Sequence, residues 1–573
     1  MVETRRVVIE RGVSAQMRDG CTLVADIYRP DDGDRHPVLV QRTPYDRTLI
    51  GNAASDIDPI KMALAGYVVV VQDVRGRFDS EGVFVTYDAE AEDGHDTVQW
   101  AAQQAWSDGN VGMFGLSYMA QCSLLAASQR PAALRAIAVL ESPDNATGGD
   151  RYRGGALSLG LLASWAMQTI VPSAVLRAAR TDPSRYAELP AVIDDIDNLD
   201  AYMSRLPLVP FPPMDDRQGV DPTHQFDATV RYEFQPAVPR FQPSDISVPA
   251  LVIAGWHDLF LQPDLDLFGD LRSSGATDEV RRLTRLIVGP WAHGTPTATV
   301  GETDFGLRAS PLFMGLREDF SKLHKRWFDA RMRGKRGGID EEPPVRIFIM
   351  GLNRWRDEQE WPLSRAVHQE WHLHGDGGLS TERPGDSEPS TFALDPDNPV
   401  PTVGGATLMT GKYLRGPIEQ HRVESRDDVL LFTSEPRDTP LEVTGRLAFV
   451  AWVAAETADT DLVARLCDVH PDGRSFHLCD GILRLRFREG IATPRPLEPG
   501  EVYRVEVDLW STAHVFLPGH RLRLQVRASD FPRYDRNPGT GQTSAEVDLV
   551  LPQRNRLFHD PQRPSHLVLP VID

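Results

Sequence analysis

Short apolar runs alternate with helix-forming segments along the first 340 residues. The runs predict strands at residues 22–28, 37–41, 67–73, 111–114, 134–140, 249–255 and 283–288. Helices are predicted between them at residues 62–65, 88–106, 119–128 and 312–332. Most of the strands are apolar throughout, which is typical of a parallel sheet covered on both faces by helices. We therefore expect an α/β domain built from two parts, residues 1–143 and 241–344.

A different pattern interrupts this alternation at residues 144–240. Helical periodicity is found at residues 156–170 and 173–179, and a stretch rich in Pro and Asp follows at residues 206–222. No further apolar strand of the series occurs there. The segment is predicted to be a helical cap inserted into the α/β domain.

After Pro343-Pro344 the periodicity changes from helical to alternating. Alternating segments occur at residues 345–350, 447–453, 462–469, 502–509 and 522–526, separated by turns rich in Gly, Pro and Asp. This pattern predicts an all-β sandwich or jelly roll over residues 345–573.

Composition restricts the class of protein. The 573 residues are 41% hydrophobic and 25% charged, which is ordinary for a soluble globular protein. The net charge of −21 argues against nucleic acid as a partner. We expect no membrane partner, because no stretch approaches the ~20 apolar residues of a spanning helix. The four cysteines form no C-x-x-C motif, so reduced thiols and a cytoplasmic location are expected. Whether the protein is a homodimer stays open.

The most informative stretch is residues 110–121. A buried strand runs into Gly115, Leu116 and Ser117, and a helix follows. A serine on a sharp strand-to-helix turn projects its Oγ above the sheet, and the helix N-terminus offers free N–H groups to an oxyanion. The usual signature is G-x-S-x-G, and here Met119 occupies the second glycine position. The motif alone is weak, so the serine needs partners elsewhere in the chain.

Two such partners follow the next strands. Asp258 comes directly after the strand at 249–255, and His293 follows the strand at 283–288. The order Ser, Asp, His after successive strands is that of an α/β-hydrolase. Asp73 ends an earlier strand and is an alternative carboxylate, whereas His257 is interpreted as a solvent-facing loop histidine. The predicted fold is an α/β-hydrolase core with an inserted helical cap and a C-terminal jelly roll.

Several sequence blocks resemble the cocaine-esterase (CocE/NonD) family of Xaa-Pro dipeptidyl-peptidase-like serine hydrolases. The blocks are residues 44–45, 75–76, 106–118, 255–258, 289–293 and 516–521, and the resemblance covers the whole chain. The family elbow reads G-x-S-Y-x-G, and here its last position is Ala120, from which we expect a slightly shifted elbow.

The resemblance implies a role for each site residue. Ser117 is the nucleophile, His293 the general base and then acid, and Asp258 its orienting carboxylate. Tyr45, on the loop where α/β-hydrolases place an oxyanion donor, would act beside the backbone N–H of Tyr118. The residues implied to line the substrate pocket are Trp165, Phe260, Leu408 and Met409. No metal or cofactor is implied.

Three functions remain in competition on the sequence alone. The first is a serine esterase that forms an acyl-enzyme on small esters with an uncharged, aromatic or medium-chain acyl group. The second is an α-amino-acid ester hydrolase or acyltransferase, or a dipeptidyl peptidase specific for Xaa-Pro. The third is a catalytically inactive protein that binds carbohydrate through its jelly roll. Selection of a substrate ammonium requires carboxylates beside the acyl site, yet the first acid after Asp258 is Asp264.

Overall fold

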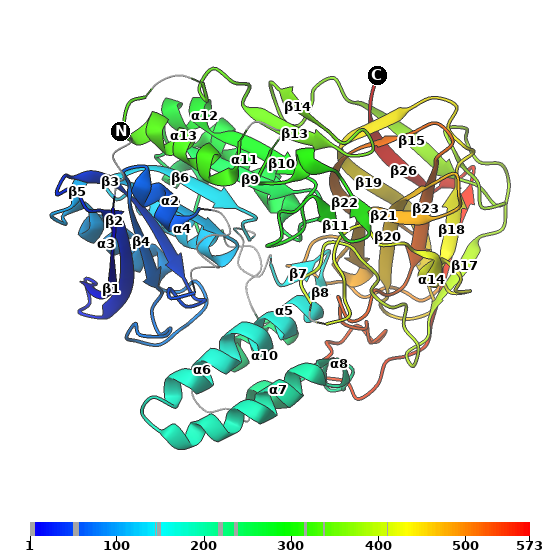
Figure 1. Ribbon diagram of the computed structural model, residues 1–573. Helices are drawn as coiled ribbons and strands as arrows, with labels where there is room; N and C mark the ends of the chain where they lie inside the picture. The colour runs from blue at the N-terminus through cyan, green and yellow to red at the C-terminus, as the bar shows by residue number, and fades with distance from the viewer. Residues whose placement is uncertain are drawn as a thin grey trace.

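The N-terminal domain is organised around one ten-stranded sheet (Figure 1). The computed structural model describes residues 6–49, 57–143, 145, 150–215, 222–233, 239–314, 318–335, 338–409 and 411–573. The sheet order is β1-β2-β4-β3-β5-β6-β9-β10-β13-β14, and its central strands from β4 to β13 are parallel. Its strands are β1 Val7–Gln16, β2 Thr22–Pro30, β3 His36–Thr43, β4 Val68–Asp73, β5 Ser107–Leu116, β6 Leu134–Leu140, β9 Ala250–Gly255, β10 Arg285–Gly289, β13 Val345–Ile349 and β14 Arg354–Glu358.

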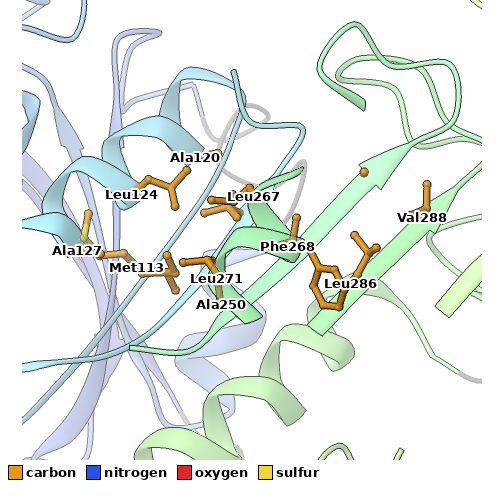
Figure 2. Packing of buried hydrophobic residues seen from close by; sticks show 14 of the residues in the cluster. Met113, Ala120, Leu124, Ala127, Ala250, Leu267, Phe268, Leu271, Leu286 and Val288 are labelled. Carbon is orange, nitrogen blue, oxygen red and sulfur yellow. The ribbon is translucent and has the colours of Figure 1, made fainter. Parts of the chain in front are cut away.

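Helices cover both faces of this sheet, because alternate residues of each strand point to opposite sides. Helices α3 (Glu90–Ala102), α4 (Tyr118–Ser128) and α11 (Leu261–Ser274) share one apolar cluster with one set of strand residues, as Figure 2 shows for Leu124, Leu271 and Met113. Helices α2 (Pro59–Leu64) and α13 (Phe320–Met332) share a second cluster with the other set. The predicted α/β class is confirmed.

Local signals explain one difference from the predicted boundaries. The helix predicted from residue 312 begins at Phe320, since the Asp319 side chain accepts the Lys322 N–H at 2.7 Å as an N-cap. The remaining short elements of this domain are α12 Asp278–Leu283, η3 Pro243–Asp245, η4 Leu307–Ala309, β11 Thr299–Val300 and β12 Thr303–Asp304.

The inserted segment, the predicted cap, consists mainly of helices that project from the junction of the other two domains (Figure 1). Its elements are β7 Tyr152–Arg153, β8 Ala156–Leu157, α5 Leu159–Trp165, η1 Ala166–Ile170, α6 Val171–Ala178, η2 Pro183–Glu188, α7 Leu189–Asp197, α8 Leu199–Met203, α9 Pro212–Asp215 and α10 Pro222–Val230. The segment η1 is a π-helix within an otherwise α-helical run. Such wide turns are often found at functional sites.

One apolar helix of the cap differs from the sequence-based expectation. Among the described residues, the run Leu159–Ala178 has a mean hydropathy of 1.5 and is long and apolar enough to cross a membrane. The statement that no stretch approaches this length was therefore wrong. Half of the run is buried inside the molecule. One row of its buried residues recurs every four positions and packs in the core of the cap, at Leu159, Ala163, Met167, Val171 and Val175.

The boundary predicted between residues 344 and 345 falls inside the core sheet. Strand β13 pairs in parallel with β10, and β14 pairs antiparallel with β13. The alternation at residues 345–350 was assigned to the jelly roll because a short apolar strand has the same periodicity in either domain. The hairpin β13–β14 therefore ends the core sheet.

The C-terminal domain is an antiparallel sandwich of two sheets around a third apolar cluster. One sheet has the order β16-β15-β26-β19-β24-β17, with β22 on β19 and β25 on β24; the other has the order β18-β23-β20-β21. The elements are β15 Val367–Leu373, β16 Leu379–Ser380, β17 Ser390–Leu394, α14 His421–Glu424, β18 Leu430–Thr433, β19 Leu441–Ala455, β20 Asp461–Val469, β21 Ser475–Arg484, η5 Leu485–Phe487, β22 Tyr503–Phe516, β23 Arg521–Arg527, β24 Gln553–Asp560, β25 Arg563–Pro564 and β26 His566–Ile572.

Candidate active site

Ser117 occupies the turn between β5 and α4. Its backbone has φ 59° and ψ −122°, a left-handed conformation that is strained for a residue other than glycine. Close packing holds this turn: a Cβ on Gly115 would lie 2.5 Å from backbone and side-chain atoms of Met119. Ala120, which stands where the family pattern has glycine, is fully buried in the sheet-facing cluster. The sharp turn is therefore formed with alanine at this position, and Ser117 lines the adjoining cavities.

Asp258, His293 and Ser117 are linked by hydrogen bonds at the carboxyl edge of the sheet. His293 Nε2 lies 3.0 Å from Ser117 Oγ, and His293 Nδ1 lies 2.7 Å from Asp258 Oδ2. Asp258 is fully buried, and its Oδ1 accepts the Phe260 N–H at 2.6 Å, which fixes the carboxylate. Three residues far apart in sequence thus form one relay, because β5, β9 and β10 end at the same edge.

The alternatives weighed at these strand ends have different environments. Asp73 is buried and accepts the Arg47 backbone N–H at 2.8 Å and its guanidinium, so it belongs to a structural ion pair. His257 is 2% exposed and packs on Phe305, and burial lowers its pKa to about 3. The interpretation of His257 as solvent-facing was wrong, because the jelly roll covers a loop that would be exposed in the core alone: His477, Leu478 and Cys479 share a small cavity with it.

Tyr118 and Tyr45, the two expected oxyanion donors, both lie next to Ser117 in the wall of one cavity. Tyr118 begins α4, and an N–H in the first helical turn has no intrahelical acceptor. The Tyr45 hydroxyl faces Ser117, and it accepts the Trp165 indole N–H at 3.1 Å. Because the indole is the donor in this contact, the Tyr45 O–H itself donates to a different group. Burial raises the pKa of Tyr45 to about 12, so the hydroxyl keeps its proton at neutral pH.

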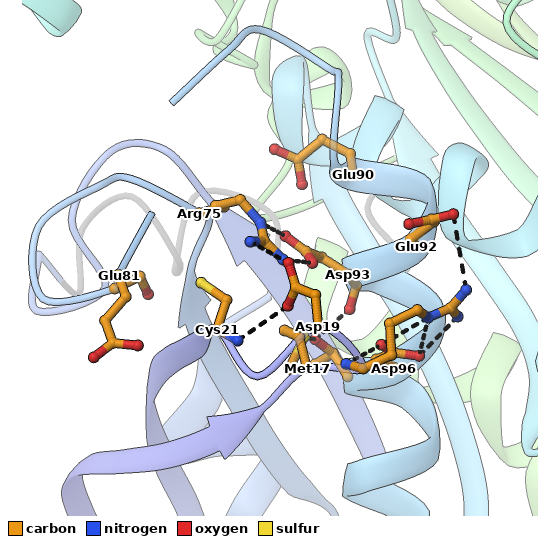
Figure 3. A network of polar contacts seen from close by, with 12 residues as sticks. Met17, Asp19, Cys21, Arg75, Glu81, Glu90, Glu92, Asp93 and Asp96 are labelled. Atoms are coloured by element: carbon orange, nitrogen blue, oxygen red, sulfur yellow. Dashed lines mark hydrogen bonds and ion pairs between the residues drawn. The ribbon is translucent and has the colours of Figure 1, made fainter. Parts of the chain in front are cut away.

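A buried ionic network supports the elbow from behind. The Tyr118 hydroxyl donates to Glu90 at 2.9 Å, and Arg42 donates to the other Glu90 oxygen at 2.6 Å. Arg42 also lies 3.7 Å from Asp93, which accepts two hydrogen bonds from Arg75 (Figure 3). Because Glu90 and Asp93 both lie on α3, the network ties this helix to the start of α4.

An apolar cavity opens beside Ser117 where cap, core and jelly roll meet. The structure places Trp165, Phe260 and Leu408 in its wall, together with Tyr45 and Tyr87. Met409 lines an adjoining cavity that reaches His293. Phe260 packs edge-on against His293, with ring centroids 5.2 Å apart. All four predicted pocket residues therefore lie within the region of the site.

Among the described residues, Asp150 brings a carboxylate to the wall of this cavity. Its Oδ1 has no hydrogen-bond partner among the described residues, and Arg240 lies 3.6 Å from it. Asp144, another acid of the cap segment, lies outside the described residues. Asp264 is fully buried and accepts the Ser142 N–H at 3.0 Å, so it faces away from the cavity.

Sequence reasoning missed two charged residues at the relay. Glu141, directly after β6, is fully buried and lies 3.6 Å from His293 Nδ1. Arg415, from the jelly roll, donates to the His293 carbonyl oxygen. The strand-end rule that located Asp258 would have found Glu141. No local signal marks Arg415, which arrives through domain packing.

Three groups of described residues have possible metal-ligand atoms close together. They are Glu370, His372 and His566; Asp468, His470 and His520; and Glu141, Asp258 and His293. The third group is the relay itself. In the second, Asp468 is already bonded to His514 at 3.0 Å and to His520 at 2.8 Å. The expectation that no cofactor is needed stays a prediction.

A serine in a strand-to-helix elbow, bonded to a histidine that is bonded in turn to a buried aspartate, defines the class of protein on this sheet. The class is the serine hydrolases.

Comparison with known proteins identifies the family within that class. The model of the X-Pro dipeptidyl-peptidase (S15 family) matches residues 19–295, and the model of the X-Pro dipeptidyl-peptidase C-terminal non-catalytic domain matches residues 337–568. The chain is 36% identical to cocaine esterase of Rhodococcus sp. (strain MB1 Bresler) over 586 residues, which is 98% of each chain. The protein therefore belongs to the CocE/NonD family, and it is a serine ester hydrolase.

Solved structures agree on the fold. An aminopeptidase from a marine sediment archaeon (Thaumarchaeota) superposes with a TM-score of 0.74 at 23% identity, covering 100% of this chain and 97% of the other. An α-amino-acid ester hydrolase superposes with a TM-score of 0.73 at 22% identity and the same coverage. At these identities the likeness extends to the three-domain architecture alone.

Proposed function

We propose that this protein hydrolyses small carboxylic esters through an acyl-enzyme on Ser117. Ser117 Oγ attacks the ester carbonyl carbon while His293 Nε2 takes its proton, and the imidazolium then protonates the departing alcohol. Water attacks the acyl carbon in the same way, which releases the acid and restores Oγ–H. The observation that carries the proposal is the relay of 2.7 and 3.0 Å hydrogen bonds beside an apolar cavity.

The first test is a panel of p-nitrophenyl and aryl esters of graded acyl size, assayed with the wild type and Ser117→Ala. The variant is expected to fold normally and to lose ~10⁴–10⁶-fold in kcat, because Ser117 Oγ is the hydroxyl that His293 Nε2 contacts among the described residues. Labelling by a fluorophosphonate should disappear in the same variant. If Ser117→Ala kept more than a few per cent of the activity, Ser117 would not be the nucleophile.

The preferred acyl group is proposed to be uncharged, and aromatic or of medium length. The walls next to Ser117 are largely aromatic and aliphatic, which favours an apolar acyl group. Phe260 places a ring beside His293, where recognition of an α-ammonium would need a carboxylate. The acid that follows in sequence, Asp264, is bonded to the Ser142 N–H rather than directed into the cavity.

One observation favours the second candidate, an α-amino-acid ester hydrolase. The Asp150 carboxylate lines the cavity, with one oxygen that lacks a hydrogen-bond partner among the described residues. A substrate ammonium in the cavity would find a counter-charge there. Against this, Arg240 already lies 3.6 Å from Asp150 and neutralises part of its charge.

A matched pair of substrates separates the two candidates. Phenylacetate and phenylglycine esters of one alcohol differ only by the amino group, and they are compared at a pH where the amine is protonated. We expect the higher kcat/KM for phenylacetate, and little effect of Asp150→Asn on that substrate. A preference for phenylglycine that is lost in Asp150→Asn would establish the second candidate instead.

A further inference from the structure

Glu141 reaches the site because of the order of strands in the sheet. Strand β6 lies between β5, which carries Ser117, and β9, which carries Asp258. The residue that follows β6, Glu141, therefore lies at the same carboxyl edge of the sheet as Ser117 and Asp258. The Glu141 N–H donates to the Ile253 carbonyl at 2.9 Å, and its φ of 51° is in the left-handed region, strained for a residue other than glycine.

The Glu141 side chain contacts both His293 and the residue that follows it. Oε2 accepts the Gly294 N–H at 2.6 Å and lies 3.6 Å from His293 Nδ1. Asp258 Oδ2 lies 2.7 Å from the same nitrogen. His293 Nδ1 is thus faced by two buried carboxyl groups from different strands. Glu141 Oε1 has no hydrogen-bond partner among the described residues. Within that part of the chain, the side chain is therefore held by its hydrogen bond with the Gly294 N–H.

The charges around this pair come from three further elements. Asp258 and Asp264 face Glu141 from the loop after β9 and from α11, and Arg415 faces it from the jelly roll. Burial first, and then the like charge of Asp258, raise the pKa of Glu141 well above its ordinary value. The raised pKa of Glu141 favours its protonated form while the Asp258 carboxyl group is beside it. Removal of Asp258 would allow Glu141 to ionise.

We propose that Glu141 is a positioning residue for His293, and that it supplies a substitute carboxylate to Nδ1 when Asp258 is absent. The inference rests on the proposed role of His293 as general base. The hydrogen bond from the Gly294 N–H to Glu141 fixes the position of the loop that carries His293. The Glu141 carboxyl group also lies 3.6 Å from His293 Nδ1, within reach of the imidazolium. Asp258 makes the shorter contact with His293 Nδ1 and is therefore the main orienting carboxylate in the native protein.

The test is a double-mutant cycle on kcat with a saturating p-nitrophenyl ester. Glu141→Gln keeps an oxygen for the Gly294 N–H and removes the ionisable group, so we expect a loss of about 3–10-fold. Asp258→Ala is expected to lose only ~10²-fold, less than the ~10⁴ that follows loss of a triad aspartate elsewhere. In the Asp258→Ala background, Glu141→Gln should then lose a further ~10²-fold. The excess of this loss over the loss in the single variant is the signature of a substitute carboxylate.

The control is Asp264→Asn, which alters a buried acid that also faces Asp258 but has no contact with His293. Its cost in kcat is expected to differ between the two backgrounds far less than that of Glu141→Gln, because Asp264 acts on this pair only through its charge. A second readout is the pH profile: kcat of Asp258→Ala should rise with pH in two steps, one from His293 and one from Glu141, and the double variant should keep only the step from His293.

Equal costs of Glu141→Gln in the two backgrounds, or a pH profile that is unchanged by it, would overturn the role of Glu141. Fluorophosphonate labelling of Ser117 is measured on every variant and reports folding of the elbow. If Asp258→Ala fails to fold, the comparison of Glu141→Ala with Glu141→Gln decides: similar losses in kcat would overturn positioning through the Gly294 contact. Failure of Ser117→Ala to abolish labelling would refute the proposed function itself.

Discussion

Tyr45 shows how a single hydroxyl is prepared for a developing charge. Its oxygen accepts the Trp165 indole N–H at 3.1 Å, and it faces Ser117. Tyr45→Phe removes one oxyanion donor and little volume, so we expect kcat to fall roughly 10²–10³-fold with KM nearly unchanged. Steady-state kinetics on one aryl ester measure both constants. A change mainly in KM would indicate that Tyr45 acts as a pocket wall.

The burial of His257 predicts that the stability of the folded protein depends on pH. Its pKa is about 3 in the folded protein and about 6.5 in the unfolded chain. Between these values the unfolded chain binds the proton and the folded protein does not, so the free energy of unfolding falls as the pH falls from about 6.5 toward 3. One such proton contributes about 1.4 kcal/mol per pH unit.

Replacement of His257 should flatten that dependence. Denaturant unfolding of His257→Phe, followed from pH 7 to pH 4, is expected to show a smaller loss of stability than the wild type. His324 and His477, whose pKa values burial lowers to about 4, should retain the remaining loss. The exposed His421 is the control, and His421→Phe should leave the pH dependence unchanged.

At the scale of elements, the joint between β5 and α4 depends on a missing side chain. A Cβ at Gly115 would come within 2.5 Å of Met119 backbone and Cβ atoms, which cannot be accommodated without moving the helix. We expect Gly115→Ala to lower kcat at least ~10²-fold by displacing Ser117 Oγ, and to lower the melting temperature.

Gly269 provides the matched control for that prediction. It lies within α11, and a Cβ added there would have no atom within 4 Å. Gly269→Ala is therefore expected to preserve activity and to stabilise the protein by about 0.5–1 kcal/mol, since alanine is the better helix former. Equal behaviour of the two alanine variants in kcat and thermal unfolding would contradict the close packing of the elbow.

At the scale of the whole molecule, the jelly roll completes the active site. It supplies Leu408 and Met409 to the cavities and Arg415 to the His293 carbonyl, and Ala513 and Val515 join the apolar cluster of the core. A chain that ends at residue 365 keeps the ten-stranded sheet but loses all of these. We expect it to be insoluble or to lack esterase activity.

A point variant separates the contribution of Arg415 to catalysis from the contribution of the whole jelly roll to folding. Arg415→Gln in the complete chain should lower kcat about 10-fold, because one charge-assisted hydrogen bond to the histidine loop is lost. Lysine at the same position is expected to recover part of the activity. A soluble, active fragment 1–365 would show instead that the jelly roll is an independent appendage.

Much of the architecture follows from local pattern. Apolar runs and their order determine a parallel sheet, the interruption determines the cap, and strand ends locate Ser117, Asp258 and His293. Such features can be predicted from sequence because backbone periodicity and strand-end geometry are local properties of the chain. The hairpin β13–β14 could not be assigned in this way, since a strand has the same alternation whichever sheet it joins.

The sequence by itself determined the class of fold and the three residues of the relay. Tertiary structure alone decided the burial of His257, the hydrogen bond from Trp165 to Tyr45, and the approach of Arg415 to His293. Each of these depends on the surface that another domain or a neighbouring strand presents. Burial and charge at a site are sums over groups distant in sequence, and they exist only once the chain has packed.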